Sequence, residues 1–515
     1  MSYIPLLAVL LVVGAGLSLV RRGPNIFRYI PGPASSSWIF GHLLQLRLPL
    51  QIGDHEFTWL KKFGPVYRIK GSFGEDRLMV ADPAALQHIL NSGAFGELGP
   101  ALDAAAYALF GKNSVMVQTG HEHSRLRAGL NPGFTAIAVR RYQPIFAKVA
   151  QSISDKLDLS GESLQDMSSL FSIAAFDAIS EAVLGCSKES LAPEFVEVNL
   201  KVMNAAPTQS PAQILLEAFL KFLLKWIRRQ AVKIPTKSFQ LLQTQTRLAT
   251  QEGRRVAREK LQAIKEGVER SDDVFGFLLD PENSKEGLGF EDIVGQTSII
   301  MIAGGETTAN SLAFGFCELA KDIDFQDSLR AEIHAALSAN SSDIAYDSMP
   351  FLNAFIKETL RMYPAVPFPE RLATEDTIIP LLDPIVLRTG EKLTQIPVRK
   401  GQVVMVAIAS YHRVPHLWGN DPDIFRPSRW LDGSVHHGEA IGPYARLLTF
   451  MGGTRTCLGW RFAIMEMQII ICELLGKFSF SLPSDHFLRV RYTETLQPAD
   501  AEGKKSLRLN VKRVL

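Results

Sequence analysis

A glycine-rich loop with one cysteine is the strongest candidate for chemistry in this sequence. Residues 450–459 read Phe-Met-Gly-Gly-Thr-Arg-Thr-Cys-Leu-Gly, and a helical pattern follows at 460–475. Cys457 therefore stands just before a helix N-terminus, where free backbone N–H groups and the helix dipole stabilise a thiolate, the form that binds metal ions. Gly453 and Gly459 would let the backbone approach a flat ligand closely. A buried cysteine alone is usually inert, so the flanking pattern is what indicates a metal ligand.

The loop resembles the cysteine-ligand loop of the cytochrome P450 family, Phe-x-x-Gly-x-Arg-x-Cys-x-Gly, at every defining position. The resemblance implies a haem b whose iron takes Cys457 as its axial thiolate, a ligand that pushes electron density onto the iron and favours O–O cleavage. It also implies that Arg455 pairs with a haem propionate and that Phe450 packs near the sulfur. Cys457 is thus expected to be the metal ligand of a cofactor site.

A long apolar helix is predicted over residues 291–321, with hydrophobic side chains on every face. Its segment 303–308 reads Ala-Gly-Gly-Glu-Thr-Thr. Adjacent glycines cost roughly 1 kcal/mol each in a helix interior relative to alanine. We therefore expect Gly304 and Gly305 to let a cofactor or O₂ approach the backbone.

The same segment carries an acid beside a hydroxyl. Thr307 follows Ala303 by one helical turn, so its hydroxyl can bond the Ala303 carbonyl and open the helix locally. Glu306 lies next to Thr307 in the sequence, and an acid beside a hydroxyl provides a path along which a proton can be transferred. The segment is similar to the oxygen-activation motif of the cytochrome P450 family, and the resemblance implies two catalytic roles. Thr307 stabilises the iron-bound oxygen species, and Glu306 helps to deliver protons from solvent.

A carboxylate and two arginines are expected to form a structural network. Glu358 and Arg361 lie three residues apart on one helical face, a spacing that is common in exposed pairs and weak by itself. The segment 422–430 is similar to the Pro-x-Arg signature of the family. The resemblance implies that its Arg429 joins Glu358 and Arg361 in a buried network behind the haem, which holds the cysteine loop in place.

Further side chains are expected to bind the haem propionates. The segment 120–127 matches the helix whose Trp-x-x-x-Arg pattern contacts propionates, but His123 replaces the tryptophan. The resemblance implies that Arg127 pairs with a propionate, that His123 can donate a hydrogen bond there, and that Arg371 is a further partner. His121 and His123 have no third ligand nearby in the sequence, which disfavours a separate metal site.

Composition favours a globular protein that acts on a small molecule. The chain has 515 residues, of which 46% are hydrophobic and 21% charged, so it can bury a large core. Its net charge of +2 argues against nucleic-acid binding, which needs a concentrated basic face. Its four cysteines are too few and too widely spaced for a disulfide framework, which favours a reducing compartment.

The N-terminal region predicts a membrane anchor. Residues 3–20 carry no charge and are long enough to span a bilayer as a helix. The alternative is a cleaved signal peptide, but no basic residue precedes the run, whereas Arg21 and Arg22 follow it and favour keeping that end cytosolic. We expect a single-pass anchor at residues 1–22 in the endoplasmic reticulum membrane, with the catalytic domain on the cytosolic side.

A proline-rich hinge and one large domain are expected after the anchor. Prolines within residues 23–45 prevent helix continuation and make a stiff turn. Over residues 46–515, helical and strand patterns alternate without a break in composition, so we expect one mostly α domain with minor β. The resemblance identifies this as the cytochrome P450 fold with an N-terminal transmembrane helix. Residues 381–399 look like an extended hairpin, similar to insertions in fungal members.

One amphipathic stretch has two interpretations. In residues 214–229, Phe219, Phe222 and Trp226 alternate with lysines and arginines. The stretch is either a helix packed on the protein or a segment lying on the membrane, because aromatic side chains opposite cations suit the headgroup boundary.

The resemblance implies a monooxygenase that inserts one atom of O₂ into a lipophilic small molecule, such as a terpenoid or other secondary metabolite. Two electrons would come from NADPH through a separate flavoprotein reductase. By motif position, substrate contacts are expected at Ala303, Val366, Phe368 and Leu496, and a lid loop at residues 102–115. The expected lining is apolar, as in most ligand pockets.

Two other functions compete with monooxygenation. A haem-thiolate isomerase or dehydratase would rearrange a peroxide without O₂ or a reductase, but such members typically lack the acid and the hydroxyl that Glu306 and Thr307 provide. A non-catalytic haem sensor or carrier would not need a proton path. Both residues therefore favour the monooxygenase.

Overall fold

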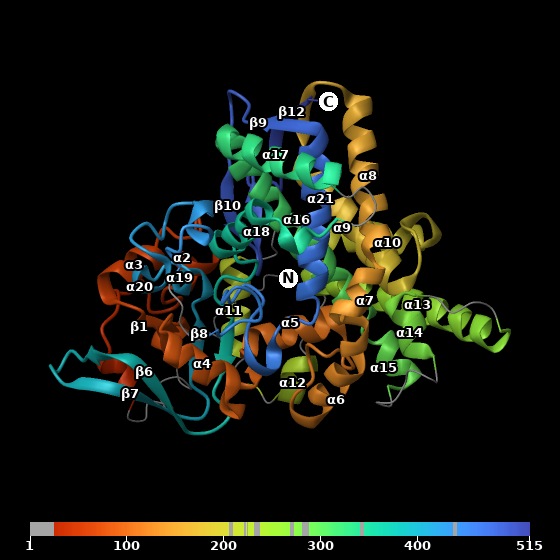
Figure 1. Cartoon of the computed structure of the whole chain (residues 1–515). Helices are drawn as coiled ribbons and strands as arrows, with labels where there is room; N and C mark the ends of the chain where they lie inside the picture. The colour runs from red at the N-terminus through yellow and green to blue at the C-terminus, as the bar shows by residue number, and fades with distance from the viewer. Residues whose placement is uncertain are drawn as a thin grey trace.

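The computed structural model describes residues 25–204, 210–220, 223, 225–230, 237–267, 272–280, 288–339, 344–435 and 440–514. The expected anchor at residues 1–22 and the side chain of Phe222 lie outside these residues. The described chain is mostly helical with minor sheet, as the sequence predicts. In Figure 1 the strands β1, β6, β7 and β8 lie on one side, the helices α8, α9, α13 and α14 lie on the other, and α16 runs between them.

The helices are named here in chain order, first those up to residue 230 and then those from residue 237 onward. The first run is α2 (Leu43–Arg47), α3 (Glu56–Phe63), α4 (Pro83–Asn91), α5 (Pro100–Phe110), α6 (Gly120–Leu130), α7 (Ala136–Arg141), α8 (Gln143–Ser160), α9 (Met167–Leu184), α10 (Pro193–Asn204), α11 (Pro211–Leu220) and α12 (Lys225–Gln230). The second run is α13 (Lys237–Lys265), α14 (Val274–Leu279), α15 (Phe290–Val294), α16 (Thr297–Lys321), α17 (Ile323–Ala339), α18 (Pro350–Met362), α19 (Ile408–Tyr411), α20 (Pro415–Trp418) and α21 (Trp460–Lys477).

The strands form small sheets that join distant parts of the chain. The largest has the order β1-β2-β8-β5-β3, a three-stranded sheet has the order β4-β12-β9, and β6-β7 and β10-β11 are hairpins. The strands are β1 (Val66–Lys70), β2 (Asp76–Val80), β3 (Glu97–Leu98), β4 (Ser163–Asp166), β5 (Glu370–Leu372), β6 (Thr377–Val386), β7 (Lys392–Val398), β8 (Val403–Val406), β9 (Phe478–Ser481), β10 (Arg489–Tyr492), β11 (Leu496–Ala499) and β12 (Arg508–Arg513). The hairpin expected within residues 381–399 is confirmed as β6-β7.

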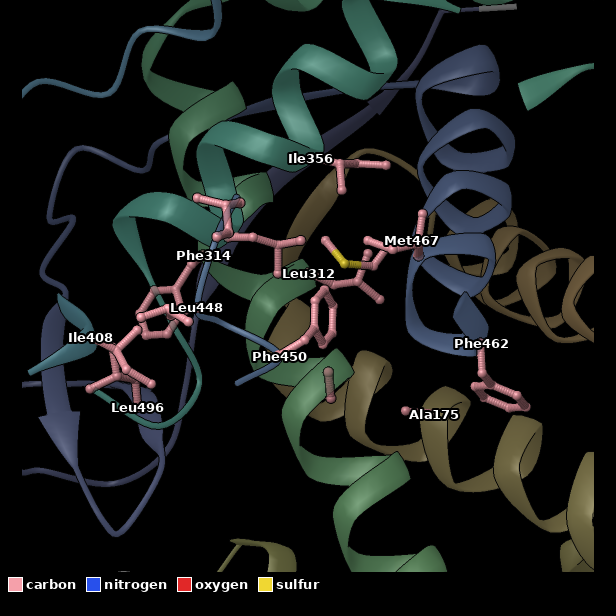
Figure 2. Packing of buried hydrophobic residues seen from close by; sticks show 14 of the residues in the cluster. Ala175, Leu312, Phe314, Ile356, Ile408, Leu448, Phe450, Phe462, Met467 and Leu496 are labelled. Atoms are coloured by element: carbon pink, nitrogen blue, oxygen red, sulfur yellow. The ribbon is translucent and has the colours of Figure 1, made fainter. Parts of the chain in front are cut away.

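The apolar helix α16 is buried among α9, α10, α18 and α21. Figure 2 shows its residues Leu312 and Phe314 among buried side chains such as Phe450 and Met467. The expectation of one helix over residues 291–321 is wrong at one point, because α15 ends before Gly295 and α16 begins at Thr297. The Gln296 side chain there accepts a hydrogen bond from the Val115 N–H and donates to the Asn113 carbonyl, each at 2.8 Å. The break thus ties α16 to the chain after α5.

The two glycines of α16 serve helix packing. A Cβ on Gly304 would lie 2.6 Å from Ile179 Cδ1 of α9, and a Cβ on Gly305 would lie 2.6 Å from Met203 Cε of α10. This packing is a structural reason for both glycines that the sequence did not reveal, and the approach of a cofactor or O₂ to this segment stays a prediction. Their missing side chains let α9 and α10 approach.

The expected lid differs from the sequence prediction, and the stretch 214–229 follows one of its two interpretations. The lid loop at residues 102–115 is largely the helix α5, and its buried Asp103 pairs with Arg228 at 3.2 Å and Arg229 at 2.9 Å. These two arginines come from the stretch 214–229, so they face the protein. In the same stretch Phe219 is buried against Phe73, with ring centroids 5.4 Å apart, whereas Trp226 is exposed. The described contacts favour a helix packed on the protein over much of this stretch.

The described part of the expected hinge at residues 23–45 packs on the body. Phe27 and Ile30 are buried, and the Arg68 N–H of β1 donates to the Pro31 carbonyl at 2.9 Å. Among the described residues, α9 is long and apolar enough to cross a bilayer. It is mostly buried in the protein, which marks it as a core helix.

Gly304→Ala tests the packing of α16. The new methyl group meets Ile179, a buried and β-branched side chain that cannot turn aside easily, so the overpacking cost should exceed the gain in helix propensity. We expect the free energy of unfolding to fall by about 1 to 2 kcal/mol, measured by chemical denaturation. Gly476→Ala in α21 is the matched control, because its Cβ would lie 3.7 Å from Ile333 and the variant should be at least as stable as the wild type. Equal stability of Gly304→Ala and the wild type would contradict the packing argument.

Candidate functional site

The cysteine loop is held by its own backbone and by α4. The Cys457 N–H donates to the Phe450 carbonyl at 2.8 Å, which closes the loop before α21 begins. Gly453 has φ +65°, and a Cβ there would lie 1.9 Å from the Leu90 carbonyl oxygen at the end of α4. Gly453 is therefore required by the contact with α4, while the close approach of a flat ligand to this loop stays a prediction. A Cβ on Gly459 would meet open space, so no described contact explains that glycine.

Cys457 has exposed surface, although the protein atoms around its thiol are close enough to desolvate it. Burial raises the pKa of the thiol, while the Gly459 backbone N–H and the charge of Arg127 lower it. The helix start acts in the predicted direction but does not by itself produce a thiolate. A bound metal ion would supply the missing stabilisation, because metal binding deprotonates a coordinating thiol.

Arg127, Arg371 and Arg455 form a cluster of cations near Cys457. Burial lowers the pKa of Arg455 to about 10, with a further contribution from Arg127. Burial also lowers the pKa of Arg371 to about 10, and Arg455 adds to this effect. Within the part of the chain that the structure describes, none of the three has a carboxylate ion pair; Arg455 donates to the carbonyls of Gly96, Val115 and Gln118, and Arg371 to that of Glu370. Such a cluster fits a ligand with negative charges.

His123 lies beside this cluster and is buried. Its pKa is lowered to about 4 by burial and by the charges of Arg455 and Arg127. The ring is therefore neutral at physiological pH and carries one N–H donor. It can donate a hydrogen bond without adding another charge to the cluster.

Thr307 makes the contact that the sequence predicts, since its hydroxyl donates to the Ala303 carbonyl at 2.9 Å. However, α16 remains helical across residues 303–308, so the expected local opening of the helix is not seen. Ala303 is exposed although Ile302 and Met301 before it are buried. This side of α16 therefore borders accessible space.

Glu306 points to the β10-β11 hairpin. Its Oε1 atom accepts hydrogen bonds from Thr495 Oγ1 at 2.6 Å and Gln497 Nε2 at 2.7 Å. Burial raises the pKa of Glu306, and Lys505, Thr495 and Gln497 oppose this effect. The sequence reasoning selected Leu496 but missed its two neighbours, Thr495 in the turn before β11 and Gln497 within β11.

The expected network around Glu358 is confirmed in its geometry. Glu358, Arg361 and Arg429 have no exposed side-chain surface. Arg361 donates to both carboxylate oxygens, at 2.9 and 2.8 Å, and Arg429 Nε donates at 2.9 Å. Burial alone would raise the pKa of Glu358, but Arg361 and Arg429 reverse the shift and lower it. The carboxylate is therefore charged and compensated.

A histidine that the sequence reasoning missed joins this network to the cysteine loop. The buried His412 accepts from the Leu448 N–H at 2.9 Å through Nε2, so its Nδ1 donates to the Arg361 carbonyl at 3.0 Å. The Thr449 hydroxyl also donates to the Leu360 carbonyl at 2.6 Å. The segment that leads to Phe450 and the loop is thus bonded to the end of α18.

The four expected substrate contacts do not share one environment. Ala303 is exposed and Val366 is half-buried, so both have accessible surface that a ligand could contact. Phe368 and Leu496 are buried, Phe368 against Tyr492 with ring centroids 4.7 Å apart. Figure 2 shows Leu496 pointing toward Ile408 in the core. In this structure Phe368 and Leu496 are core residues.

Comparisons with known proteins agree with this geometry. A sequence model of the family described as Cytochrome P450 matches residues 31–498. The chain is 30% identical to Cytochrome P450 monooxygenase 91 from Postia placenta, over 94% of both proteins. It is also 30% identical to Cytochrome P450 monooxygenase claP from Ampulloclitocybe clavipes, over 90% of this chain and 88% of that protein. With its cysteine loop and cation cluster, the chain belongs to the cytochrome P450 family, whose members carry a haem on a cysteine thiolate.

Proposed function

We propose that this protein is a monooxygenase that inserts one atom of O₂ into a lipophilic small molecule, such as a terpenoid or another secondary metabolite. The observation that carries the proposal is the pair on α16, a Thr307 hydroxyl bonded to the Ala303 carbonyl and a half-buried Glu306 next to it, whose pKa is raised by desolvation. A haem-thiolate isomerase or a haem sensor has no use for such a proton donor. The fungal relatives named above support the same class.

The cofactor in this proposal is haem b. Cys457 would ligate the iron, and Phe450 would pack near the sulfur. Arg127, Arg371 and Arg455 would bind the propionates, because the cluster has charge to neutralise and no carboxylate partner among the described residues. The neutral His123 would add a hydrogen bond. When bound, the haem activates O₂ with electrons supplied by a reductase.

The chain's own residues would transfer protons and exclude water from the site. The Thr307 hydroxyl is oriented by the Ala303 carbonyl and lies on the side of α16 that borders accessible space. Burial raises the pKa of Glu306, so this group binds a proton more readily than an exposed glutamate does, and it can take up another from solvent after it has donated one. Apolar surfaces such as Ala303 and Val366 would exclude water and contact the substrate.

Two electrons would come from NADPH through a separate flavoprotein reductase. Residues 1–22 would anchor the protein in the endoplasmic reticulum membrane with the catalytic domain in the cytosol. The uncharged run at residues 3–20 supports this placement. A lipophilic substrate would then be concentrated in the same membrane.

The function is tested with microsomes that contain the chain and a reductase. They are fed a panel of lipophilic compounds under isotopically labelled O₂, and the products are analysed by mass spectrometry. We expect NADPH-dependent products that contain one labelled oxygen atom. Rearranged or dehydrated products that form without O₂ and NADPH would instead establish the isomerase or dehydratase.

Cys457→Ala tests the metal ligand. We expect the reduced, CO-bound wild type to show the red-shifted Soret band of thiolate ligation, and the variant to lose it, because Cys457 is the one thiol of the loop. Cys472→Ala is the control, since burial raises the pKa of that thiol and α21 holds it in the core. A band that survives Cys457→Ala, or that requires Cys186, Cys317 or Cys472, would refute the assignment.

Thr307→Ala tests the proton path. The variant should keep its haem and bind substrate, but hydrogen peroxide should replace much of the product, because the hydroxyl that assists proton delivery is gone. We expect product per NADPH to fall about tenfold, a modest part of what a positioned proton donor contributes. Thr307→Ser retains the hydroxyl and should recover most of the coupling. An unchanged ratio in Thr307→Ala would remove the role given to this residue.

Glu358→Gln tests the buried network. The substitution leaves Arg361 and Arg429 buried without full compensation, a loss of about 3 to 5 kcal/mol, so we expect little haem-loaded protein. Glu473→Gln is the control, because its pair with Lys477 is partly exposed and contributes about 0 to 1 kcal/mol. Full haem content in Glu358→Gln would show that the network is not needed to hold the loop.

A further inference from the structure

The β10-β11 hairpin holds the carboxylate of Glu306 by two donors. Thr495 Oγ1 and Gln497 Nε2 both donate to Oε1, at 2.6 and 2.7 Å. Gln497 is buried and also donates to the Met203 carbonyl of α10 at 3.3 Å. We call Thr495 and Gln497 the carboxylate clamp. The clamp comes from a segment that lies far along the chain from α16.

The hairpin itself is fixed by independent contacts. The Thr493 N–H donates to the Thr495 carbonyl at 2.8 Å, and Glu494 between them has φ +67°, which makes a tight turn. The Tyr492 hydroxyl donates to Glu494 at 3.1 Å. The Leu496 N–H donates to the Ala365 carbonyl at 2.8 Å. The turn therefore presents Thr495 to Glu306 in a set orientation, as a preorganised site requires.

Lys505 is the charged group that faces Glu306 from the chain after β11. Its Nζ donates to the Ser172 hydroxyl of α9 at 3.1 Å, and it lies in a half-buried position. α10 contributes Met203 at this place, which has no charge. Among the described residues, the groups that act on the Glu306 carboxyl are thus the cation of Lys505 and the two neutral donors Thr495 and Gln497.

We propose that the carboxylate clamp positions Glu306 and sets the pH range over which it delivers protons. This inference rests on the proposed function, in which Glu306 is the proton donor. Thr495 and Gln497 are positioning residues, because they act through Glu306 and have no described contact with Thr307. In each cycle Glu306 would release one proton toward the reacting oxygen and regain one from water, so its carboxyl group is unchanged overall.

The sign of the effect follows from the hydrogen bonds. An O–H and an N–H that donate to a carboxylate stabilise its charged form and lower the pKa of Glu306, against the larger effect of burial, which raises it. Removing both donors should raise this pKa further, by about one pH unit. The acid would then stay protonated at higher pH but donate less readily, so coupling at neutral pH should fall.

The experiment compares the haem-loaded wild type with Thr495→Val/Gln497→Leu. The carboxyl band of Glu306, identified as the infrared band that Glu306→Gln removes, is titrated over a pH series without turnover. Product per NADPH is measured over the same series with the lipophile that gives most product in the panel above. Thr493→Val is the control for a disturbed turn. It removes a hydroxyl that donates to the Thr495 carbonyl at 3.3 Å and lies 3.5 Å from the Thr495 hydroxyl, but it leaves both donors to Glu306 in place. Thr495→Ser should restore wild-type behaviour at that position.

In the double variant we expect the midpoint of the infrared titration to move to higher pH by about one unit. The fall in product per NADPH on the alkaline side of the pH series should move by the same amount, and neither should move in Thr493→Val. If the double variant misfolds, Thr495→Val alone should give a smaller shift in the same direction. An infrared titration that matches the wild type would overturn the clamp, whatever the activity. If instead the titration shifts while Glu306→Gln leaves product per NADPH unchanged, the clamp positions Glu306 but the proposed proton delivery fails.

Discussion

The site depends on the ion pairs that the buried carboxylate of Glu358 forms with Arg361 and Arg429. Arg361 and Arg429 compensate it with hydrogen bonds of 2.8 to 2.9 Å, and all three side chains are fully buried. Breaking such a group is costly because the remaining charges stay desolvated. The Arg361 carbonyl then binds His412, and His412 binds the Leu448 N–H. A short chain of buried hydrogen bonds thus runs from an ion-pair network to the loop that presents the cysteine.

Close packing and a cluster of positive charge both shape the site between this network and α16. Tight packing fixes its walls: Gly453 touches the end of α4, and Gly304 touches α9. A cluster of positive charge fits an anionic ligand, because Arg127 and Arg455 are neighbouring cations whose repulsion Glu97 offsets only in part. Glu306 on α16 accepts hydrogen bonds from Thr495 and Gln497 of the β10-β11 hairpin.

Much of the fold class and site followed from the sequence, because local chemistry determined those features. The loop around Cys457 needs a fixed spacing of residue types. In any α-helix a threonine hydroxyl can reach the carbonyl four residues earlier, as Thr307 reaches Ala303. What the sequence did not reveal depends on contacts between distant segments. Gly304 is required by Ile179, and Glu306 is bonded by Thr495, a partner that no helical periodicity identifies. The lid, expected as a loop from its position alone, is a helix anchored through Asp103.

The connection from the ion-pair network to the cysteine loop is tested most directly by backbone hydrogen exchange. His412→Leu leaves Glu358, Arg361 and Arg429 in place but removes the acceptor of the Leu448 N–H. Exchange is followed by mass spectrometry in peptides that cover residues 446–457, with a peptide from α17 as the internal reference. Our account predicts faster exchange in residues 446–457 of the variant and no change in α17. Unchanged exchange in residues 446–457 of a folded variant would show that the network does not hold the loop that carries Cys457.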